Sequence, residues 1–202
     1  MINPNLKIDG YSLIRLCNEH QLLPFDCGDN DLNEFFEKEA KLFQESLLAV
    51  TYVLEDRENN RTVAFFSLLN DCISAEQFDS NRQFLKRIKS VFSPHKQFKD
   101  YPAIKIGRFG VSSPYQRKAL GSKIISILKV LFILENRTGC RYITVDAYSD
   151  ALKFYKNQGF EFFTEKDAVE DTRQMYYDLF VAKANTDICA SKAILLPKFQ
   201  TA

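Results

Sequence analysis

The sequence of 202 residues lacks several patterns that build dedicated structural or catalytic sites. It has only two histidines, His20 and His95, and neither has the cysteine or serine partner motif of a hydrolase. The five cysteines are an odd number at wide spacing with no CxxC pair, which argues against a disulfide framework and against a zinc site. We therefore expect reduced thiols and no bound metal.

Long apolar runs are also missing. The longest, at 47–50 and 130–134, are too short to span a bilayer, and residues 1–10 lack the apolar stretch and cleavage pattern of a signal peptide. Hydrophobic residues make up 46% of the chain and charged residues 26%, which is typical of a globular protein. We expect a cytoplasmic protein without a membrane partner that folds as a single domain over residues 1–202.

The formal net charge of +1 hides a basic middle. Residues 82–141 contain fourteen lysines and arginines but only two acids, Asp100 and Glu135, so the rest of the chain is acidic. A basic segment in a neutral chain favours a local anionic partner, such as the phosphates of a cofactor or of a nucleic acid. The alternative is that these cations are solvated and pair with the acidic ends in the folded chain.

Hydrophobic periodicity predicts alternating helices and strands along the chain. A helix is expected over 29–44, with Asp31 and Glu34 spaced as in a capping box. We interpret Pro94 and Pro102 as parts of a loop. The other predicted elements are helices at 76–92, 121–137 and 150–158, and strands at 47–54, 62–69, 103–111, 142–147, 160–164 and 173–180.

This order of elements predicts an α/β (α+β) protein built on a mixed, mostly antiparallel twisted sheet. The strand–helix–strand run from 103 to 147 implies a central parallel pair with a crossover helix. Hairpins before and after that run imply antiparallel strands outside it, with the helices flanking the sheet.

The predicted helix at 76–92 has two distinct sides. Arg82, Lys86 and Lys89 form a basic stripe that would meet an RNA backbone. Phe84, Ile88 and Phe92 lie on an apolar side that would serve a homodimer contact. The alternative is a solvated helix face with no partner, and these interpretations stay open.

Glycine is scarce, and its distribution marks one region. Five of the seven glycines lie between residues 107 and 159. Within that region, segment 107–122 predicts a strand, a loop carrying Arg117 and Lys118, and a helix start. The free N–H groups and the dipole of a helix N-terminus make an anion site suited to a pyrophosphate. The spacing is neither that of a P-loop nor Gly-x-Gly-x-x-Gly, and a strand–helix connection that binds nothing is the alternative.

Three segments of the sequence resemble one family. Residues 116–122 are similar to the Gln/Arg-x-x-Gly-x-Gly/Ala signature of the GNAT superfamily of acyl-CoA-dependent N-acetyltransferases, and residues 151–160 resemble its Ala-x-x-Phe-Tyr-x-x-x-Gly-Phe motif. Residues 25–35 resemble the N-terminus of a bacterial subgroup that includes toxins acetylating aminoacyl-tRNA. The resemblance covers about residues 20–180 and leaves 181–202 as a C-terminal extension.

The resemblance implies a GNAT fold, acetyl-CoA as co-substrate and direct transfer of the acetyl group to a primary amine. Tyr155 would protonate the leaving CoA thiolate, and a backbone N–H near the end of the 103–111 strand would polarise the thioester carbonyl. The residues that would hold the cofactor are Phe109, Gly110, Val111, Gln116, Arg117, Lys118, Ala119, Leu120, Gly121 and Ser122.

Two residues depart from the family pattern. Ala119 stands where most members have a glycine, and Tyr148 stands where many have an asparagine. Alanine disfavours the positive φ that glycine allows, so the loop is expected to hold phosphate differently. Asp146 is a candidate base but is interpreted as structural, and Cys27 and Cys140 are interpreted as buried packing residues.

The acceptor stays open at this level. One hypothesis is an aminoacyl-tRNA, as for the toxins, which would bring an antitoxin partner. A second is a small amine or a protein N-terminus. A third is a module that binds acyl-CoA or a partner without chemistry. An α-amino group, with a pKa near 8, reaches its reactive neutral form more readily than a lysine, near 10.4, and this mildly favours an α-amine.

Overall fold

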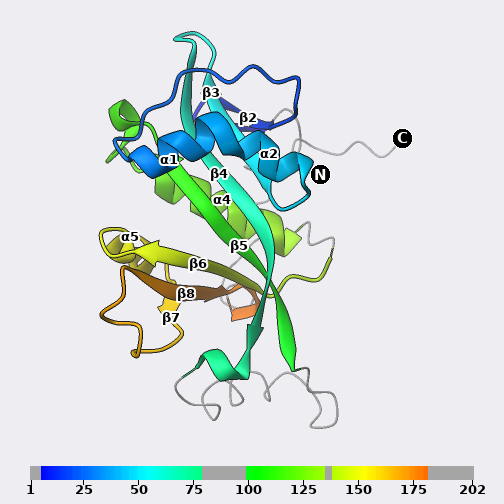
Figure 1. The fold of residues 1–202 in the computed structure, drawn as a ribbon, viewed down its shortest axis with the longest axis vertical. Coiled ribbons are helices and arrows are strands. Elements are labelled where there is room, and N and C mark those ends of the chain that lie inside the picture. The colour runs from blue at the N-terminus through cyan, green and yellow to red at the C-terminus, as the bar shows by residue number, and fades with distance from the viewer. Residues whose placement is uncertain (1–5, 79–98, 135–137, 182–202) are drawn as a thin grey trace.

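The computed structural model describes residues 6–78, 99–134 and 138–181 (Figure 1). Most of the predicted 76–92 helix, with its basic stripe and its apolar side, lies outside these ranges, as does 182–202 of the C-terminal extension. Of the predicted helix, residues 76 and 77 belong to a short 3-10 turn, η2 (Ala75–Gln77).

The described strands form one eight-stranded sheet in the order β1-β2-β3-β4-β5-β6-β8-β7. Only the pair β5–β6 is parallel, and the other neighbours are antiparallel. The predicted mixed, mostly antiparallel sheet with a central parallel pair is therefore confirmed. The strands are β1 (Lys7–Ile8), β2 (Tyr11–Arg15), β3 (Val50–Asp56), β4 (Arg61–Ser74), β5 (Asp100–Val111), β6 (Tyr142–Tyr148), β7 (Glu161–Phe162) and β8 (Thr172–Asp178).

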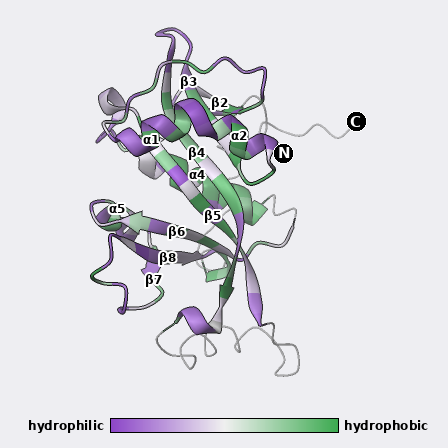
Figure 2. Ribbon diagram, in the orientation of Figure 1, coloured by the Kyte–Doolittle hydropathy of each residue, from purple (hydrophilic) through white to green (hydrophobic). Residues whose placement is uncertain are grey.

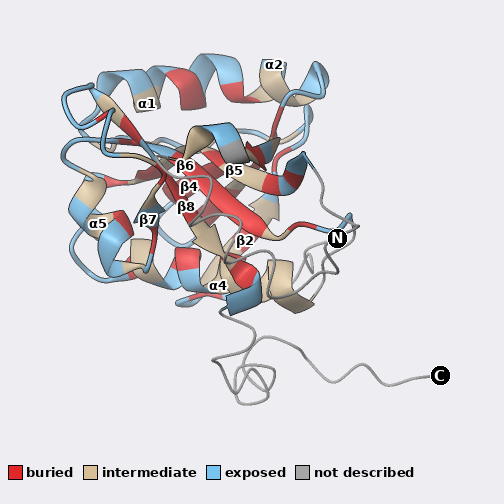
Figure 3. Ribbon diagram, turned by 90° about the horizontal axis from the view of Figure 1, so that it is seen from below, coloured by how far each residue is buried: buried red, intermediate tan, exposed pale blue. Residues whose placement is uncertain are grey.

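Helices cover both faces of this sheet. On one face, α1 (Asn30–Glu34), a π-helical turn η1 (Phe35–Glu39) and α2 (Ala40–Glu45) run on from one another. On the other face lie α4 (Leu120–Leu134) and the shorter α5 (Leu152–Asn157). Figure 3 shows the buried strands as the middle layer between these two sets of helices. Among the described residues, no helix is both long and apolar enough to cross a membrane.

Two hydrophobic clusters fix the helices to the sheet. Ile124, Ile125 and Leu128 of α4 are at most 2% exposed and pack in a cluster with Ile143 and Met175 of the sheet. The opposite cluster is aromatic and joins the helical segment 30–45 to β3 and β4; its fully buried members are Leu16, Phe35, Phe36, Ala40, Val53 and Phe65. Figure 2 shows α4 as largely hydrophobic, whereas α1 and α2 alternate between hydrophilic and hydrophobic residues, as expected for helices with one solvated side.

The first helix begins earlier than its predicted cap. The side chain of Asp29, in an extended backbone conformation, accepts a hydrogen bond of 3.0 Å from the Leu32 amide. Asp29 is therefore the N-cap, and the predicted capping box of Asp31 and Glu34 is wrong by two residues. Asp31 instead lies in the first turn, where its charge is favourable to the helix dipole.

The structure also corrects the strand boundaries. Strands β1 and β2 were not predicted. β4 continues past its predicted end at residue 69 to Ser74, and β5 begins at Asp100 instead of residue 103 but ends at Val111 as predicted. Pro102 lies inside β5 and pairs with Cys72 of β4, where a loop was predicted. Proline removes one N–H from a ladder but keeps its carbonyl, which here accepts a hydrogen bond of 3.1 Å from the Arg141 amide.

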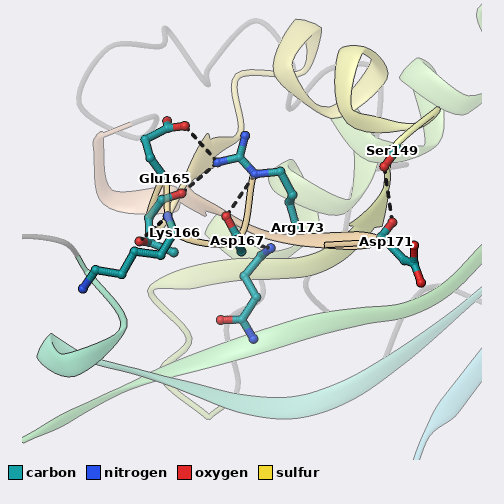
Figure 4. A network of polar contacts seen from close by, with 8 residues as sticks. Ser149, Glu165, Lys166, Asp167, Asp171 and Arg173 are labelled. Carbon is teal, nitrogen blue, oxygen red and sulfur yellow. Dashed lines mark hydrogen bonds and ion pairs between the residues drawn. The ribbon is translucent and has the colours of Figure 1, made fainter. Parts of the chain in front are cut away.

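An arginine inside β8 holds the loop that returns from β7 (Figure 4). Arg173 donates to the Asp167 carboxylate at 3.0 Å, to the Thr164 carbonyl at 2.8 Å and to Glu165 at 3.1 Å. Asp167 in turn accepts from the Gln174 amide at 3.0 Å. This network fixes the start of β8.

Candidate active site

The central parallel pair of strands separates part of the way along. Strands β5 and β6 are paired only from Ala103 with Tyr142 to Ile106 with Val145, although β5 continues to Val111 and β6 to Tyr148. The two strand ends therefore diverge and leave a gap between them.

A β-bulge at Gly107 coincides with this separation. Leu68 of β4 pairs with Ile106 and Ser67 pairs with Arg108, so Gly107 is an extra residue on β5. Bulges bend the strand that carries them and increase its twist, which turns the end of β5 away from β6. A Cβ at Gly107 would lie 2.1 Å from Leu69 Cδ1, so any other residue at this position would require the Leu69 side chain to move.

The direction of the backbone amides past the bulge follows from one contact. The Ser112 N–H donates to the Val63 carbonyl of the β4 side at 2.9 Å. In an extended strand, successive residues direct their N–H groups to opposite sides, so the Gly110 amide also faces β4. The amides of Phe109 and Val111 therefore point into the gap.

A cavity of about 540 Å³ occupies the gap. Its walls come from the ends of β5 and β6, from α5 and from the segment before α1. Its charged groups include Arg108 and a pair formed by Lys105 with Asp146. The residues that border it on the α1 side are Cys27, Asp29 and Leu32, and on the α5 side Ala151 and Tyr155.

A second cavity of about 510 Å³ lies at the N-terminus of α4. The two cavities adjoin, and together they are called the groove. Both are bordered by Phe109, Val111, Gln116, Asp150, Ala151 and Tyr155. Every residue predicted to bind the cofactor borders one cavity or the other except Lys118, whose ammonium lies 5.7 Å from the centre of the Tyr115 ring.

The α4 N-terminus presents unpaired backbone donors to this groove. The first hydrogen bond of the helix runs from the Lys123 N–H to the Ala119 carbonyl at 3.0 Å, so the amides of residues 120–122 precede it. No acidic residue lies in the first turn, which leaves the positive end of the dipole available to an anion. Arg117 and Ala119 have φ of 59° and 60°, so the loop does use the left-handed conformation that alanine disfavours.

The side chain of Gln116 ties this loop to two distant segments. Its amide donates to the Cys27 carbonyl at 2.8 Å and to the Val111 carbonyl at 2.9 Å. The Ser113 amide adds a bond of 2.9 Å to the Asp26 carbonyl. The segment before α1 is thereby held against the end of β5, which forms the α1-side wall of the first cavity.

Tyr155 lies on α5 with only 5% of its surface exposed. Its ring packs against Phe154 and Phe160 at centroid distances of 5.1 and 5.3 Å. No hydrogen bond joins its hydroxyl to another described residue. Burial raises the pKa of this phenol above its ordinary value, so it stays protonated and able to donate. Gly159, with φ of 81°, ends the helix as predicted and fixes the turn into β7.

Several residues of the first cavity were not among the predicted site residues. Leu69, Lys105 and Arg108 enter it from β4 and β5. Cys27, interpreted as a buried packing residue, is half-exposed, and its thiol lies 3.2 Å from Asn33 Oδ1. Cys140 is buried, as interpreted. Among the described residues, no group of three histidines, cysteines or acids lies close enough to hold a metal ion.

A mixed sheet whose central parallel strands diverge beside a helix N-terminus fits the GNAT fold that the sequence resembles. A family model described as an acetyltransferase (GNAT) domain matches residues 56–184, more than half of the chain. The chain belongs to the GNAT family and is an acetyl-CoA-dependent N-acetyltransferase, so the predicted family, enzyme class and co-substrate are confirmed.

Solved structures with a similar fold include proteins described as toxins. A tyrosine-to-phenylalanine variant of KacT has a TM-score of 0.69 and 18% identity over 87% of this chain and 99% of its own. AtaT complexed with acetyl-methionyl-tRNAfMet has a TM-score of 0.69 and 17% identity, covering 86% and 98%. AtaTR bound with AcCoA has a TM-score of 0.67 and 18% identity, covering 88% and 98%. At sequence identities this low, the similarity shows the fold alone.

The positive φ of Ala119 predicts a stabilising substitution. Ala119→Gly is expected to raise the free energy of unfolding by about 0.5–1 kcal/mol, because glycine adopts this conformation without the Cβ penalty. Chemical denaturation measures the change. Ala168→Gly is the matched control, since Ala168 is exposed and is not among the residues with positive φ, so glycine there lowers stability. An equal loss of stability in both variants would contradict the prediction.

Proposed function

We propose that this enzyme transfers the acetyl group of acetyl-CoA to the α-amino group of an aminoacyl-tRNA. The observation that carries the proposal is the groove of two adjoining cavities, which extends from the α4 N-terminus past Tyr155 to the wall on the α1 side. Such a groove can hold a pyrophosphate at one end and expose a thioester to an amine at the other.

The cofactor end is assigned to the start of α4. The amides of Leu120, Gly121 and Ser122 would bind the pyrophosphate, and the exposed side chains of Arg117 and Lys118 would add positive charge beside it. The pantetheine arm would then lie along β5 and occupy the gap, with its amides paired to the backbone of Phe109–Val111.

The chemistry follows from what borders the gap. The neutral amine attacks the thioester carbon, and the carbonyl oxygen becomes an oxyanion that accepts from the amide of Phe109 or Val111. Such a donor contributes roughly 3–4 kcal/mol to transition-state stabilisation in an enzyme where it was measured. When the C–S bond breaks, the CoA thiolate takes the proton of the Tyr155 hydroxyl, and the proton released by the amine restores the phenol through solvent.

Support for the acceptor comes from solved structures of similar fold. The toxin AtaT was solved with acetyl-methionyl-tRNAfMet, and also bound to the C-terminus of the antitoxin AtaR. We extend both partner classes, a charged tRNA and an antitoxin, to this chain, and such an acceptor places it in the cytoplasm. Asp146 is paired with Lys105, so it is not assigned as a base. An α-amine, with its pKa near 8, needs the least help to become neutral.

The proposed acid predicts the effect of a single-atom change. Tyr155→Phe is expected to lower kcat about 100-fold, because the thiolate then leaves without a proton donor. The affinity for acetyl-CoA and the melting temperature should stay the same, since the ring packing is kept. Tyr177→Phe is the matched control, because Tyr177 borders neither cavity and its ring lies 3.8 Å from the Lys129 ammonium. An unchanged kcat in Tyr155→Phe would show that Tyr155 is not the proton donor.

The proposed acceptor predicts a strong dependence on salt. Initial rates should be measured with charged tRNA, uncharged tRNA, free amino acids and peptides with free N-termini. We expect acetylation of charged tRNA alone, with kcat/KM falling at least about 10-fold between 50 and 200 mM salt, because RNA binding releases counterions. Salt-insensitive turnover of amino acids or peptides, without activity on charged tRNA, would instead assign a small-amine or protein acceptor. Binding of acetyl-CoA without turnover of any acceptor would favour the non-catalytic module.

A further inference from the structure

Leu69 is a leucine whose position no hydrophobic cluster explains. It lies on β4, is only half-buried, and borders the first cavity. It belongs to none of the three clusters formed by the described residues. Its pairing partner on β5 is Lys105, so it shares the α1-side face of the sheet with a charged residue.

The side chain of Leu69 occupies the space beside the Gly107 Cα. The position that a Cβ would take on Gly107 is 2.1 Å from Leu69 Cδ1 and 3.5 Å from Cγ. The leucine side chain therefore lies flat on the backbone of the bulge, in the space that any other residue at 107 would fill. Leu69 and Gly107 border the first cavity together with Ile106 and Val145, the last pair of β5 and β6.

The order of groups along the groove places an acyl chain at this end. This step rests on the proposed placement of acetyl-CoA, with its phosphates at α4 and its sulfur at Tyr155. An acyl group attached to that sulfur extends away from α4, toward Gly107, Val145 and Leu69, which all border the first cavity.

Polar groups lie next to this apolar end. Lys105 is paired with Asp146, and both residues border the first cavity. A longer alkyl chain would have to displace Leu69 or lie against these groups, and a hydrocarbon cannot replace their solvation. We propose that Leu69, seated on Gly107, limits the acyl donor to a short chain and so sets the enzyme's selectivity for acetyl-CoA.

The proposal is tested with a panel of acyl-CoA thioesters. Dissociation constants for acetyl-, propionyl-, butyryl- and hexanoyl-CoA are measured by calorimetry on the whole protein, which requires no acceptor. The wild type should bind butyryl-CoA at least about 10-fold more weakly than acetyl-CoA, as expected for a pocket that excludes added methylenes. Leu69→Ala removes an isopropyl group and should reduce that ratio by about 10-fold.

Two further variants distinguish a limit on acyl-chain length set by Leu69 itself from a general loosening of the cavity. Leu69→Met keeps the side-chain volume and should retain the preference for acetyl-CoA. Leu32→Ala shortens the same residue type on the α1 wall of the same cavity and should leave the acyl-CoA ratios unchanged. Thermal unfolding of each variant confirms that it is folded before binding is compared.

The outcomes distinguish this inference from the proposed function. If acetyl-CoA binds and Leu69→Ala keeps the wild-type ratios, the inference fails and the placement of the cofactor stands. The inference also fails if Leu69→Ala and Leu32→Ala change the ratios equally, or if Leu69→Ala alters only the preference among acceptors. If no acyl-CoA binds to the wild type, the proposed function and the inference both fail.

Discussion

The active groove depends on the extra residue that Gly107 adds to β5. Because of this bulge, β5 stays paired with β4 on one side while it leaves β6 on the other after Ile106 and Val145. Backbone amides that would normally pair inside a sheet are then left to face a cavity. Leaving a buried amide without a hydrogen-bond partner costs free energy. These amides instead face a space in which a ligand can accept their hydrogen bonds.

The surrounding structure holds this opening from both sides. Gln116 bonds the carbonyls of Cys27 and Val111, so one side chain joins the N-terminal segment, the end of β5 and the loop before α4. Across the gap, the Arg173 network fixes the start of β8, whose Thr172 pairs with Tyr148 at the end of β6. The groove is therefore held in place where β5 and β6 no longer pair. This fixed geometry is the pre-organisation that group transfer between oriented reactants requires.

The fold was largely predictable from the sequence, because its elements follow from local patterns. The parallel pair followed from the strand–helix–strand order, and the end of α5 followed from Gly159. The motif around Tyr155 indicated the family. The short strands β1 and β2 were not predicted, because strands of two and five residues show little hydrophobic periodicity. The cap at Asp29 was missed because Asp31 offered a competing pattern only two residues away.

The acceptor side of the site could not be predicted from local sequence. Leu69, Arg108 and Cys27 border one cavity only because β4, β5 and the segment before α1 are brought together in the fold. The bulge depends on the register between β4 and β5, which no single strand encodes. Gly107 was visible as a scarce glycine, but its purpose became clear only through the contact with Leu69.

Amide hydrogen exchange at Phe109 and Val111, followed by NMR with and without acetyl-CoA, tests the central claim most directly. Both amides should exchange quickly in the free protein and at least about 10-fold more slowly when acetyl-CoA is bound, because the pantetheine arm then accepts or covers them. The amide of Gly110, which faces β4, should be protected in both states. Equal protection of all three amides in the free protein, or no change at saturating acetyl-CoA, would contradict the account.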